Sequence, residues 1–472
     1  MNMAARVILA LSLLLSAAAA QKPSASGKAS SVTAYKLIAL KVTGTTRYTD
    51  KEILAASGLQ LGQNAADGDF KEAVQRLGDS GLFSNGSYSY SSSNAGTKLE
   101  LQLADTDQSK LVPAQFENFV WFTDAELLAA LQRRVPLFKQ LLPVTGNLPD
   151  RLAEALQATL TEKQFPGRVD FLREGDESGG ALHAIVYRVE EVSIRIRNVE
   201  FLGASPDETP LLTTAARRLT GAEYARATLA AAAKFDLLPV YLQRGYLKAA
   251  FGPSDARVVP EPSTTADAQT PAEPHSEIQV DAIVPVMPGK VYSTSSVDWK
   301  GNSALTTAEV APLVHLPPGQ PADAVRLLRD VETVTKLYRS RGYMTVQVKP
   351  DAQFDDEKSA VHYDLNVVEG DLYKMGDLEI AGLDTQSKAR LQAAWTLREG
   401  QPYNADYPRK FLADTRDLVP RGVRWAMSIH ETLDAKYKTV DVEIRFKQSR
   451  AENSCKRQNI FCNPKVARES LY

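Results

Sequence analysis

The residue types that could do chemistry are few and dispersed in this chain of 472 residues. No two histidines have the i, i+4 spacing of metal ligands on a helix, and no Gly-x-Ser-x-Gly or phosphate-binding glycine motif occurs. The acidic pairs Glu190-Glu191 and Asp355-Asp356 fall in expected loops and strand ends, where solvation accounts for them. We therefore expect no catalytic residues, no cofactor and no metal site. The histidines are His183, His275, His315, His362 and His430.

The two cysteines, Cys455 and Cys462, lie close together near the C-terminus. In an oxidising compartment such a pair can form a local disulfide, but spacing alone does not establish the geometry of the bridge. The sequence therefore leaves a disulfide and two free thiols open. Two cysteines without a nearby histidine are too few for a structural zinc site.

The N-terminus has the order of a secretory signal peptide. Arg6 supplies a positive charge, residues 7–15 form a short apolar run, and Ala18 and Ala20 stand where an Ala-x-Ala cleavage site would be. The run is shorter than the roughly 20 residues of a spanning helix. We expect residues 1–20 to be removed and residues 21–34 to form a linker, so that the mature protein is exported.

The composition argues against a nucleic-acid-binding protein. Charged residues make up 24% of the chain and the net charge is −2, with no basic cluster of the kind that binds nucleic acid. The length is too great for one hydrophobic core and indicates several domains.

Three short landmarks recur in the same order at a period of roughly 80 residues. The first is an alternating run ending in Gly, as at residues 40–44, 199–203, 297–301 and 378–382. The second follows a helical stretch and contains Gly62, Gly221, Gly319 and Gly400. The third ends a longer amphipathic helix, as at Gly81-Leu82, Gly245-Tyr246, Gly342-Tyr343 and, more weakly, Gly422-Val423. Two β-type runs follow it, of which the second lies at 98–103, 277–283, 361–368 and 439–446.

Each unit thus reads strand, helix, helix, strand, strand. This order predicts an α+β fold of tandem domains, each a small mixed three-stranded sheet with two helices on one face. The expected divisions are 35–108, 109–191, 192–291, 292–371 and 372–448, followed by a tail at 449–472. Residues 253–275, rich in Pro, Ala, Ser, Thr and acidic residues, are expected to form a flexible insertion in the third unit.

The landmark series resembles the POTRA repeats of BamA-type outer-membrane assembly proteins. Residues 397–403 (Leu-Arg-Glu-Gly-Gln-Pro-Tyr) and 339–348 are the nearest matches, and the resemblance covers about 35–447. The second unit departs from it, because Pro166-Gly167 replaces Gly-Tyr. Its expected elements are a strand at 116–121, helices at 124–133 and 149–163, and a strand at 182–189. BamA-type proteins end in a membrane β-barrel, for which residues 449–472 are too short, so we expect no barrel.

The resemblance implies that the strand after Gly-Tyr lies at the sheet edge and that the last strand lies in the middle. An exposed edge can accept an extended guest as a further strand. The expected edges are 84–90, 246–251, 343–348 and 424–429. The candidate contact residues are Tyr246, Leu247, Tyr343, Met344, Thr345, Val346, Gln347 and Val348. The variant Gln347→Pro is expected to weaken capture, because proline lacks the N–H of the edge.

The expected function is a periplasmic scaffold, associated with the outer membrane indirectly, that binds assembly components or unfolded barrel clients by strand addition. Two alternatives stay open: a structural subunit of an envelope complex without client binding, and a cryptic periplasmic hydrolase. For each expected edge the alternative is that it is simply solvated or covered by a neighbour.

Overall fold

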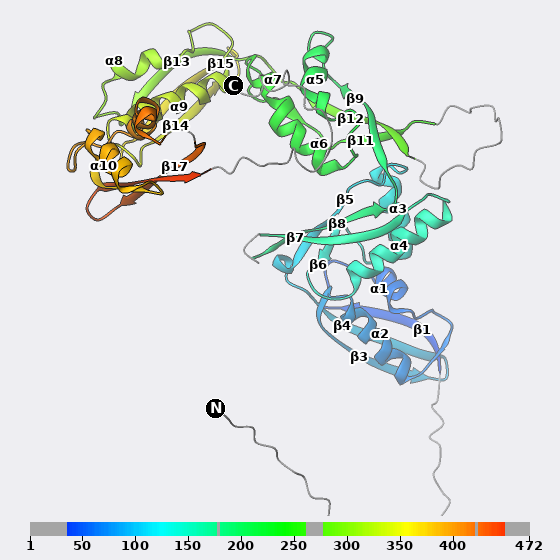
Figure 1. The fold of residues 1–472 in the computed structure, drawn as a ribbon. Coiled ribbons are helices and arrows are strands. Elements are labelled where there is room, and N and C mark those ends of the chain that lie inside the picture. Colours follow the sequence, from blue (N-terminus) through cyan, green and yellow to red (C-terminus); the bar gives the residue numbers. More distant parts are fainter. Residues whose placement is uncertain (1–34, 177–179, 261–276, 421–422, 449–472) are drawn as a thin grey trace, which may run out of the picture. The chain divides into compact units, whose positions relative to one another are not determined.

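The computed structural model describes residues 35–176, 180–260, 277–420 and 423–448. They divide into two compact parts, which differ from the five repeat units. One comprises the described residues up to Gln115 with Asp124–Phe165 and Val169–Tyr187, and the other comprises Phe116–Thr123, Pro166–Arg168 and the described residues from Arg188 onward. Five small sheets follow one another along the chain, and helices connect their strands (Figure 1). The α+β class with tandem POTRA-like units is therefore confirmed. The signal-peptide, linker and tail segments, with Cys455 and Cys462, lie outside the described residues.

The first two sheets each have four strands. In the first unit the elements are β1 (Tyr35–Thr43), α1 (Asp50–Ser57), β2 (Asn64–Ala65), α2 (Asp67–Asp79), β3 (Phe83–Ser93) and β4 (Gly96–Asp105). In the second they are η1 (Gln108–Lys110), β5 (Leu111–Phe116), α3 (Asp124–Arg134), β6 (Leu141–Pro143), α4 (Leu148–Glu162), β7 (Arg168–Gly175) and β8 (Leu182–Glu190). The strand orders are β2-β1-β4-β3 and β6-β5-β8-β7.

The third unit has a helix interrupted by a π-helical turn. Its elements are β9 (Ile194–Leu202), α5 (Thr209–Ala215), η2 (Ala216–Arg218), α6 (Arg226–Ala232), η3 (Ala233–Leu237), α7 (Leu238–Leu242), β10 (Ala250–Phe251), β11 (Asp255–Val258) and β12 (Ile278–Met287). The turn ends at Leu237, two residues before Pro239, which has no N–H to donate to the preceding helical turn. Strand β12 pairs with β9 on one side and with β10 and β11 on the other.

The last two units have three-stranded sheets of identical topology. The fourth contains β13 (Ser293–Lys300), α8 (Thr307–Val310), η4 (Ala311–Leu313), α9 (Ala324–Ser340), β14 (Gln347–Asp355) and β15 (Ala360–Val368). The fifth contains β16 (Lys374–Ala381), α10 (Thr385–Ala394), α11 (Tyr407–Asp414), η5 (Arg416–Leu418), β17 (Trp425–Asp434) and β18 (Thr439–Gln448). The orders are β13-β15-β14 and β16-β18-β17.

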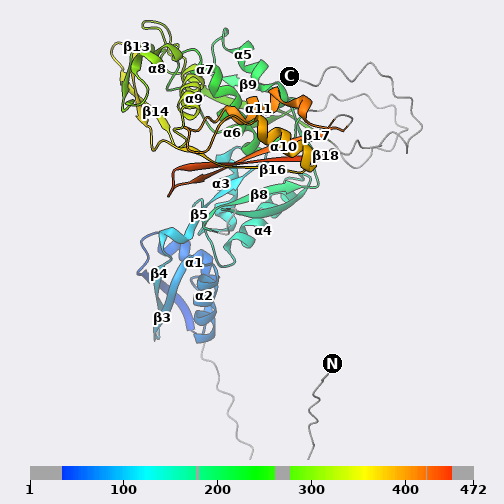
Figure 2. The ribbon, with the colours of Figure 1, turned by 60° about the vertical axis from the view of Figure 1, so that its left-hand side comes forward.

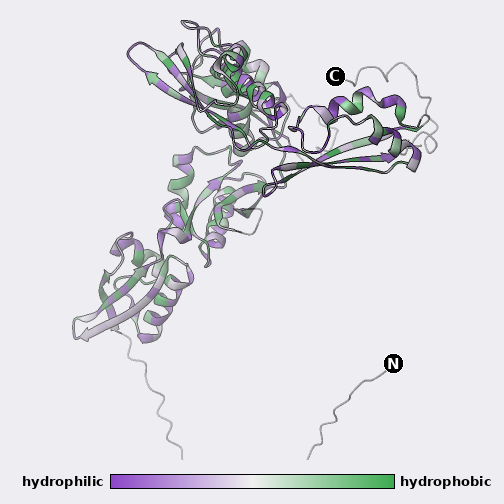
Figure 3. Ribbon diagram, turned by 90° about the vertical axis from the view of Figure 1, so that its left-hand side faces the viewer, coloured by the Kyte–Doolittle hydropathy of each residue, from purple (hydrophilic) through white to green (hydrophobic). Residues whose placement is uncertain are grey.

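Alternating hydropathy explains how each sheet packs. In β18, Val440, Val442 and Ile444 are almost fully buried and Arg445 is exposed. The apolar side joins a core with α10 and α11, which lie on one face of the sheet (Figure 2). Polar and apolar bands alternate along the strands throughout (Figure 3). Because side chains of a strand alternate between its two faces, one face is left polar.

Three expectations about local structure are wrong. The first strand of the second unit is β5 at Leu111–Phe116, not 116–121, where the chain turns and buries Phe119 and Val120. The insertion expected to be flexible at 253–275 begins with strand β11, which pairs with β12. Residues 261–275 lie outside the described residues. The first three sheets also contain a short fourth strand where three strands were expected.

Among the described residues no helix is both long and apolar enough to span a bilayer.

The junctions between consecutive units of the C-terminal part are built from the third landmark. The N–H of Tyr292 donates to the carbonyl of Gly245, and the N–H of Tyr373 donates to that of Gly342, each at 2.8 Å. Both tyrosines are buried at the first strand of the next unit. The same backbone contact therefore recurs wherever Gly-Tyr precedes a new sheet, which explains why this landmark repeats.

Gly342 has a steric role at its junction. Its φ is +97°, and a Cβ there would lie 2.8 Å from the carbonyl oxygen of Tyr373. Gly400 has a φ of +80° but nothing within 4 Å of such a Cβ. The two glycines therefore share the backbone constraint and differ in the close contact.

We expect Gly400→Ala to cost about 1–2 kcal/mol, the usual penalty of a left-handed non-glycine residue. Gly342→Ala should cost more, because the backbone of the next unit must also move away. Urea unfolding measures both, and hydrogen exchange at the Tyr373 amide reports the junction. Equal losses and unchanged exchange in the two variants would contradict this role of Gly342.

An ion pair spans the junction between the third and fourth units. The Nζ of Lys248 lies 2.6 Å from Oδ1 of Asp356, and the hydroxyl of Tyr292 donates to the same carboxylate. Lys248 also lies over the rings of Tyr292 and Phe354. The hydrogen bond from Lys248, followed by that from Tyr292, lowers the pKa of Asp356. The hydrogen bond to Asp356 raises the pKa of Lys248.

A lowered carboxyl pKa stabilises the folded state above the unfolded pKa of about 3.9, and this contribution is lost as the pH falls through the lower folded value. Asp356→Asn should therefore reduce the urea midpoint at pH 7, and the difference from wild type should shrink below about pH 4. Urea titrations at pH 7, 5 and 3 test this. A difference that does not change with pH would show that the carboxylate charge has no role.

Candidate partner-binding edges

The central strand of each sheet separates two different edges. It pairs in parallel with the first strand of its unit in four sheets, as β15 does with β13, and antiparallel with the strand that precedes it. The second sheet has the same strand order. The strand after the third landmark is consequently at an edge and the last strand is central, as the resemblance implied.

The edge formed by the first strand is covered by the second landmark. Gly319 N–H donates to the carbonyl of Thr294, whose N–H donates to Gln320, and the N–H of Ala322 donates to Tyr292. The same three bonds recur in the fifth unit, where Gly400, Gln401 and Tyr403 face Met375 and Tyr373. This cover was not predicted from the sequence. The signal was the Gly-Gln-Pro order, because a turn glycine followed by proline suits a short segment at a sheet margin.

The third landmark ends the helix and does not start the strand. The N–H of Tyr343 donates to the carbonyl of Tyr338, and that of Gly342 donates to Arg339, which together form a Schellman motif. The rings of Tyr338 and Tyr343 pack edge to face. Tyr246 makes the same contacts with Tyr241.

The candidate contact residues are therefore only partly on strands. Gln347 and Val348 begin β14, whereas the preceding turn contains Tyr343, Met344, Thr345 and Val346. Val346 is also buried. Tyr246 and Leu247 lie in the corresponding turn before β10. In contrast, 84–90 lies within β3, and all but the first residue of 424–429 lies within β17.

Pro350 shows which backbone groups of β14 point outward. It pairs with Leu365 in the middle of the ladder with β15. In an antiparallel pair a residue directs its N–H and C=O together, either toward the partner or away, and proline is tolerated where they point away. Val348 and Ala352, each two residues from Pro350, also direct their N–H and C=O groups away from β15, and their side chains pack on the core. The N–H of Gln347 points toward β15 instead, so Gln347→Pro would break the ladder and would not test the edge.

Strand β17 is the corresponding edge without a proline. It is antiparallel to β18 over ten residue pairs without a register shift. Strand direction and the face of the side chain together fix where the N–H points in a strand of L-residues. Trp425 and Ile429 pack toward the core, so their N–H and C=O groups point outward. Met427 and Leu433 lie an even number of residues away from them and therefore have the same orientation. Strand β3 is also free of proline, but its register shifts between Phe83 and Asn85.

The helix-facing side of β17 carries one residue held by a hydrogen bond and two exposed apolar residues. The buried Tyr403 donates a hydrogen bond of 2.6 Å to Glu431, and burial together with this bond raises the pKa of Tyr403. The side chains of Met427 and Leu433 are 43% and 40% exposed. Along the described residues β17 pairs with β18 alone. The strand thus offers backbone hydrogen bonds beside exposed apolar side chains.

The histidines are placed separately, but one has acidic neighbours. His183 lies near Asp176 and His315 near Asp330, whereas His362 lies between two carboxylates, those of Asp298 and Asp364. The sequence predicted no metal site, and it did not reveal that two carboxylates lie beside His362, because Asp298 comes from a strand distant in sequence. His430 is exposed on β17, and His275 lies outside the described residues.

Comparison with known proteins places one unit in a family. Residues 292–370 match the family model described as POTRA, surface antigen variable number repeat. Among solved structures, POTRA3-5 of BamA from Haemophilus influenzae is 18% identical, covering 54% of this chain and 96% of that chain with a TM-score of 0.41. POTRA1-3 of the periplasmic domain of Omp85 from Anabaena is 15% identical, covering 55% and 96% with a TM-score of 0.24. CdiB from Escherichia coli is 15% identical, covering 51% and 35% with a TM-score of 0.19.

The matched residues contain β13 to β15, and the fifth unit repeats their topology and their strand-covering contacts. Residues 292–370 therefore form a POTRA domain, and the order of strands and helices in this domain repeats in tandem along the described residues.

Proposed function

We propose that this protein is a periplasmic scaffold that captures extended polypeptides by adding them to the outer edge of β17. The proposed partners are outer-membrane assembly components or unfolded barrel clients. The observation that carries the proposal is the uninterrupted ten-residue edge of β17. The signal-like N-terminus supports export, and the POTRA domain supports a role in outer-membrane assembly or transport.

Backbone pairing suits a carrier of many guests. Alternate residues of β17, from Trp425 to Leu433, each offer one donor and one acceptor to an added strand. A hydrogen bond contributes about 0.5–1.5 kcal/mol net, and ordering the guest offsets part of the sum. The result is weak, reversible capture that depends little on the guest sequence.

Apolar side chains give the edge a preference for one class of guest. Met427 and Leu433 are exposed on the helix-facing side of the sheet. A guest with alternating apolar residues can place its apolar side next to them while its polar side continues the polar face. This alternation is the pattern of transmembrane β-strands, so strand segments of unfolded barrel proteins fit the edge.

The decisive variant is Met427→Pro, which removes one outward N–H without removing a ladder hydrogen bond. We expect it to weaken binding of a labelled 11-residue peptide of alternating Val and Thr about threefold to tenfold, the value of one hydrogen bond. Fluorescence anisotropy measures the affinity. Met427→Ala is the control, since it loses the same side chain and keeps the N–H.

Equal affinity of the two variants would remove the edge from the mechanism. Absence of peptide binding by the wild type, with co-purified envelope proteins retained in both variants, would instead favour a structural subunit without client binding.

A complementary variant concerns β14, where Pro350 removes an outward donor at the edge. Pro350→Val should increase capture there, because it restores an N–H at a position whose neighbours already point outward. A photo-crosslinking residue at Phe354, which is exposed, reports peptide bound along β14. Crosslinking yield should rise in Pro350→Val, and an unchanged yield would show that proline does not limit this edge.

A further inference from the structure

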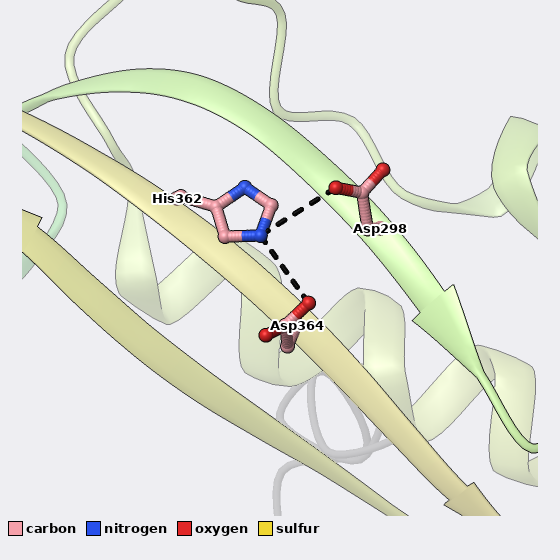
Figure 4. Close-up of side chains that lie close together, drawn as sticks. All are labelled: Asp298, His362 and Asp364. Carbon is pink, nitrogen blue, oxygen red and sulfur yellow. Dashed lines mark hydrogen bonds and ion pairs between the residues drawn. The ribbon is translucent and has the colours of Figure 1, made fainter.

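Three side chains converge on the polar face of the fourth sheet (Figure 4). Asp298 comes from β13, and His362 and Asp364 come from β15. Nε2 of His362 lies 3.5 Å from Oδ2 of Asp298 and 3.2 Å from Oδ1 of Asp364. One ligand atom from each residue falls within 4.8 Å of the other two. The site lies on the face opposite the helices and is separate from the outward edge of β14.

The neighbours hold two of these side chains in place. Oγ of Ser296 lies 2.7 Å from Nδ1 of His362. In the metal-bound state Nδ1 would donate its proton to Ser296, which would leave the lone pair of Nε2 to bind an ion between the two carboxylates.

Asp364 is only 4% exposed. Its Oδ2 accepts hydrogen bonds from Lys300 at 2.7 Å and Gln353 at 2.8 Å, which orients Oδ1 toward His362. The hydrogen bond from Lys300, followed by that from His362, lowers the pKa of Asp364. Its carboxylate is thus a buried anion with one oxygen held and the other directed at the imidazole.

We propose that Asp298, His362 and Asp364 bind a divalent transition-metal ion, Zn²⁺ in the first instance. Zinc binds nitrogen and oxygen ligands at about 2.0–2.2 Å, so neighbouring ligands of a tetrahedral site are about 3.3–3.6 Å apart. The distances from Nε2 to the two carboxylates are already close to this spacing. One imidazole with two carboxylates favours zinc or a similar ion over calcium and magnesium, which take oxygen ligands.

The charges also fit a divalent ion. A metal-bound imidazole is neutral, so the negative charge of the site comes from the two carboxylates, and Lys300 compensates for only one of them. A bound Zn²⁺ balances the remaining charge, but Lys300 opposes it because like charges repel. Three protein ligands leave a fourth position for water or for a donor from a bound polypeptide. The ion would also tie β13 to β15. This site does not depend on strand addition at β17.

The experiment titrates the full mature chain with ZnCl₂ in competition with a chromophoric chelator. Cys455 and Cys462 are replaced by serine in every variant, because thiolates bind zinc themselves. His362→Gln should weaken zinc binding by at least about tenfold, and Ser296→Ala by about tenfold, as loss of an outer partner does. His315→Gln is the matched control, because His315 faces a single aspartate, and it should leave the affinity unchanged.

Lys300→Met gives a test in the opposite direction, since removal of the competing charge should tighten zinc binding. Co²⁺ adds a spectroscopic readout, because the loss of its visible absorption bands in His362→Gln would show ligation by this histidine. Circular dichroism confirms that each variant is folded. The proposal is overturned if the wild-type background binds no zinc at about 100 μM, a concentration within the range of weak binding sites. It is also overturned if His362→Gln binds zinc as tightly as His315→Gln.

Discussion

The parallel pairing of the first strand of a unit with its last strand is the interaction on which the rest of the structure depends. Two parallel strands cannot be joined by a tight turn, so the chain between them must cross over, and it does so as helices with one further strand. In the fourth unit β13 and β15 are such a pair, and α9 and β14 lie between them in sequence. This pairing makes the last strand central and leaves β14 at the margin.

The two margins of a sheet then acquire different properties. The first strand is covered by the turn that carries Gly319 or Gly400, which donates hydrogen bonds along it. The other margin is open along β17 and is altered in β14 by Pro350. One proline thus distinguishes two strands of identical topology. Proline at a sheet edge is one of the features by which proteins limit unwanted strand pairing.

The polar face of the sheets carries a second kind of chemistry. On the central strand, Asp281 is buried by a bidentate contact with Arg197, and Asp364 is buried beside Lys300. A buried carboxylate requires such partners because desolvation of an unpaired charge is costly. In the fourth unit His362 and Asp298 join this arrangement, which turns an ion pair into a set of three converging ligands.

The sequence alone determined the order of elements, because alternation, helical periodicity and helix-ending glycines are local properties. It therefore located α9 and β15, whereas the topology of the sheets was expected only from the resemblance of the landmarks to POTRA repeats. It placed the start of β14 too early, because Gly342-Tyr343 closes a helix through contacts with Tyr338 that an isolated motif does not reveal. Tertiary structure decided which edge is covered and which residues surround His362, since those neighbours come from segments that are distant in sequence and meet only when the parallel strands pair.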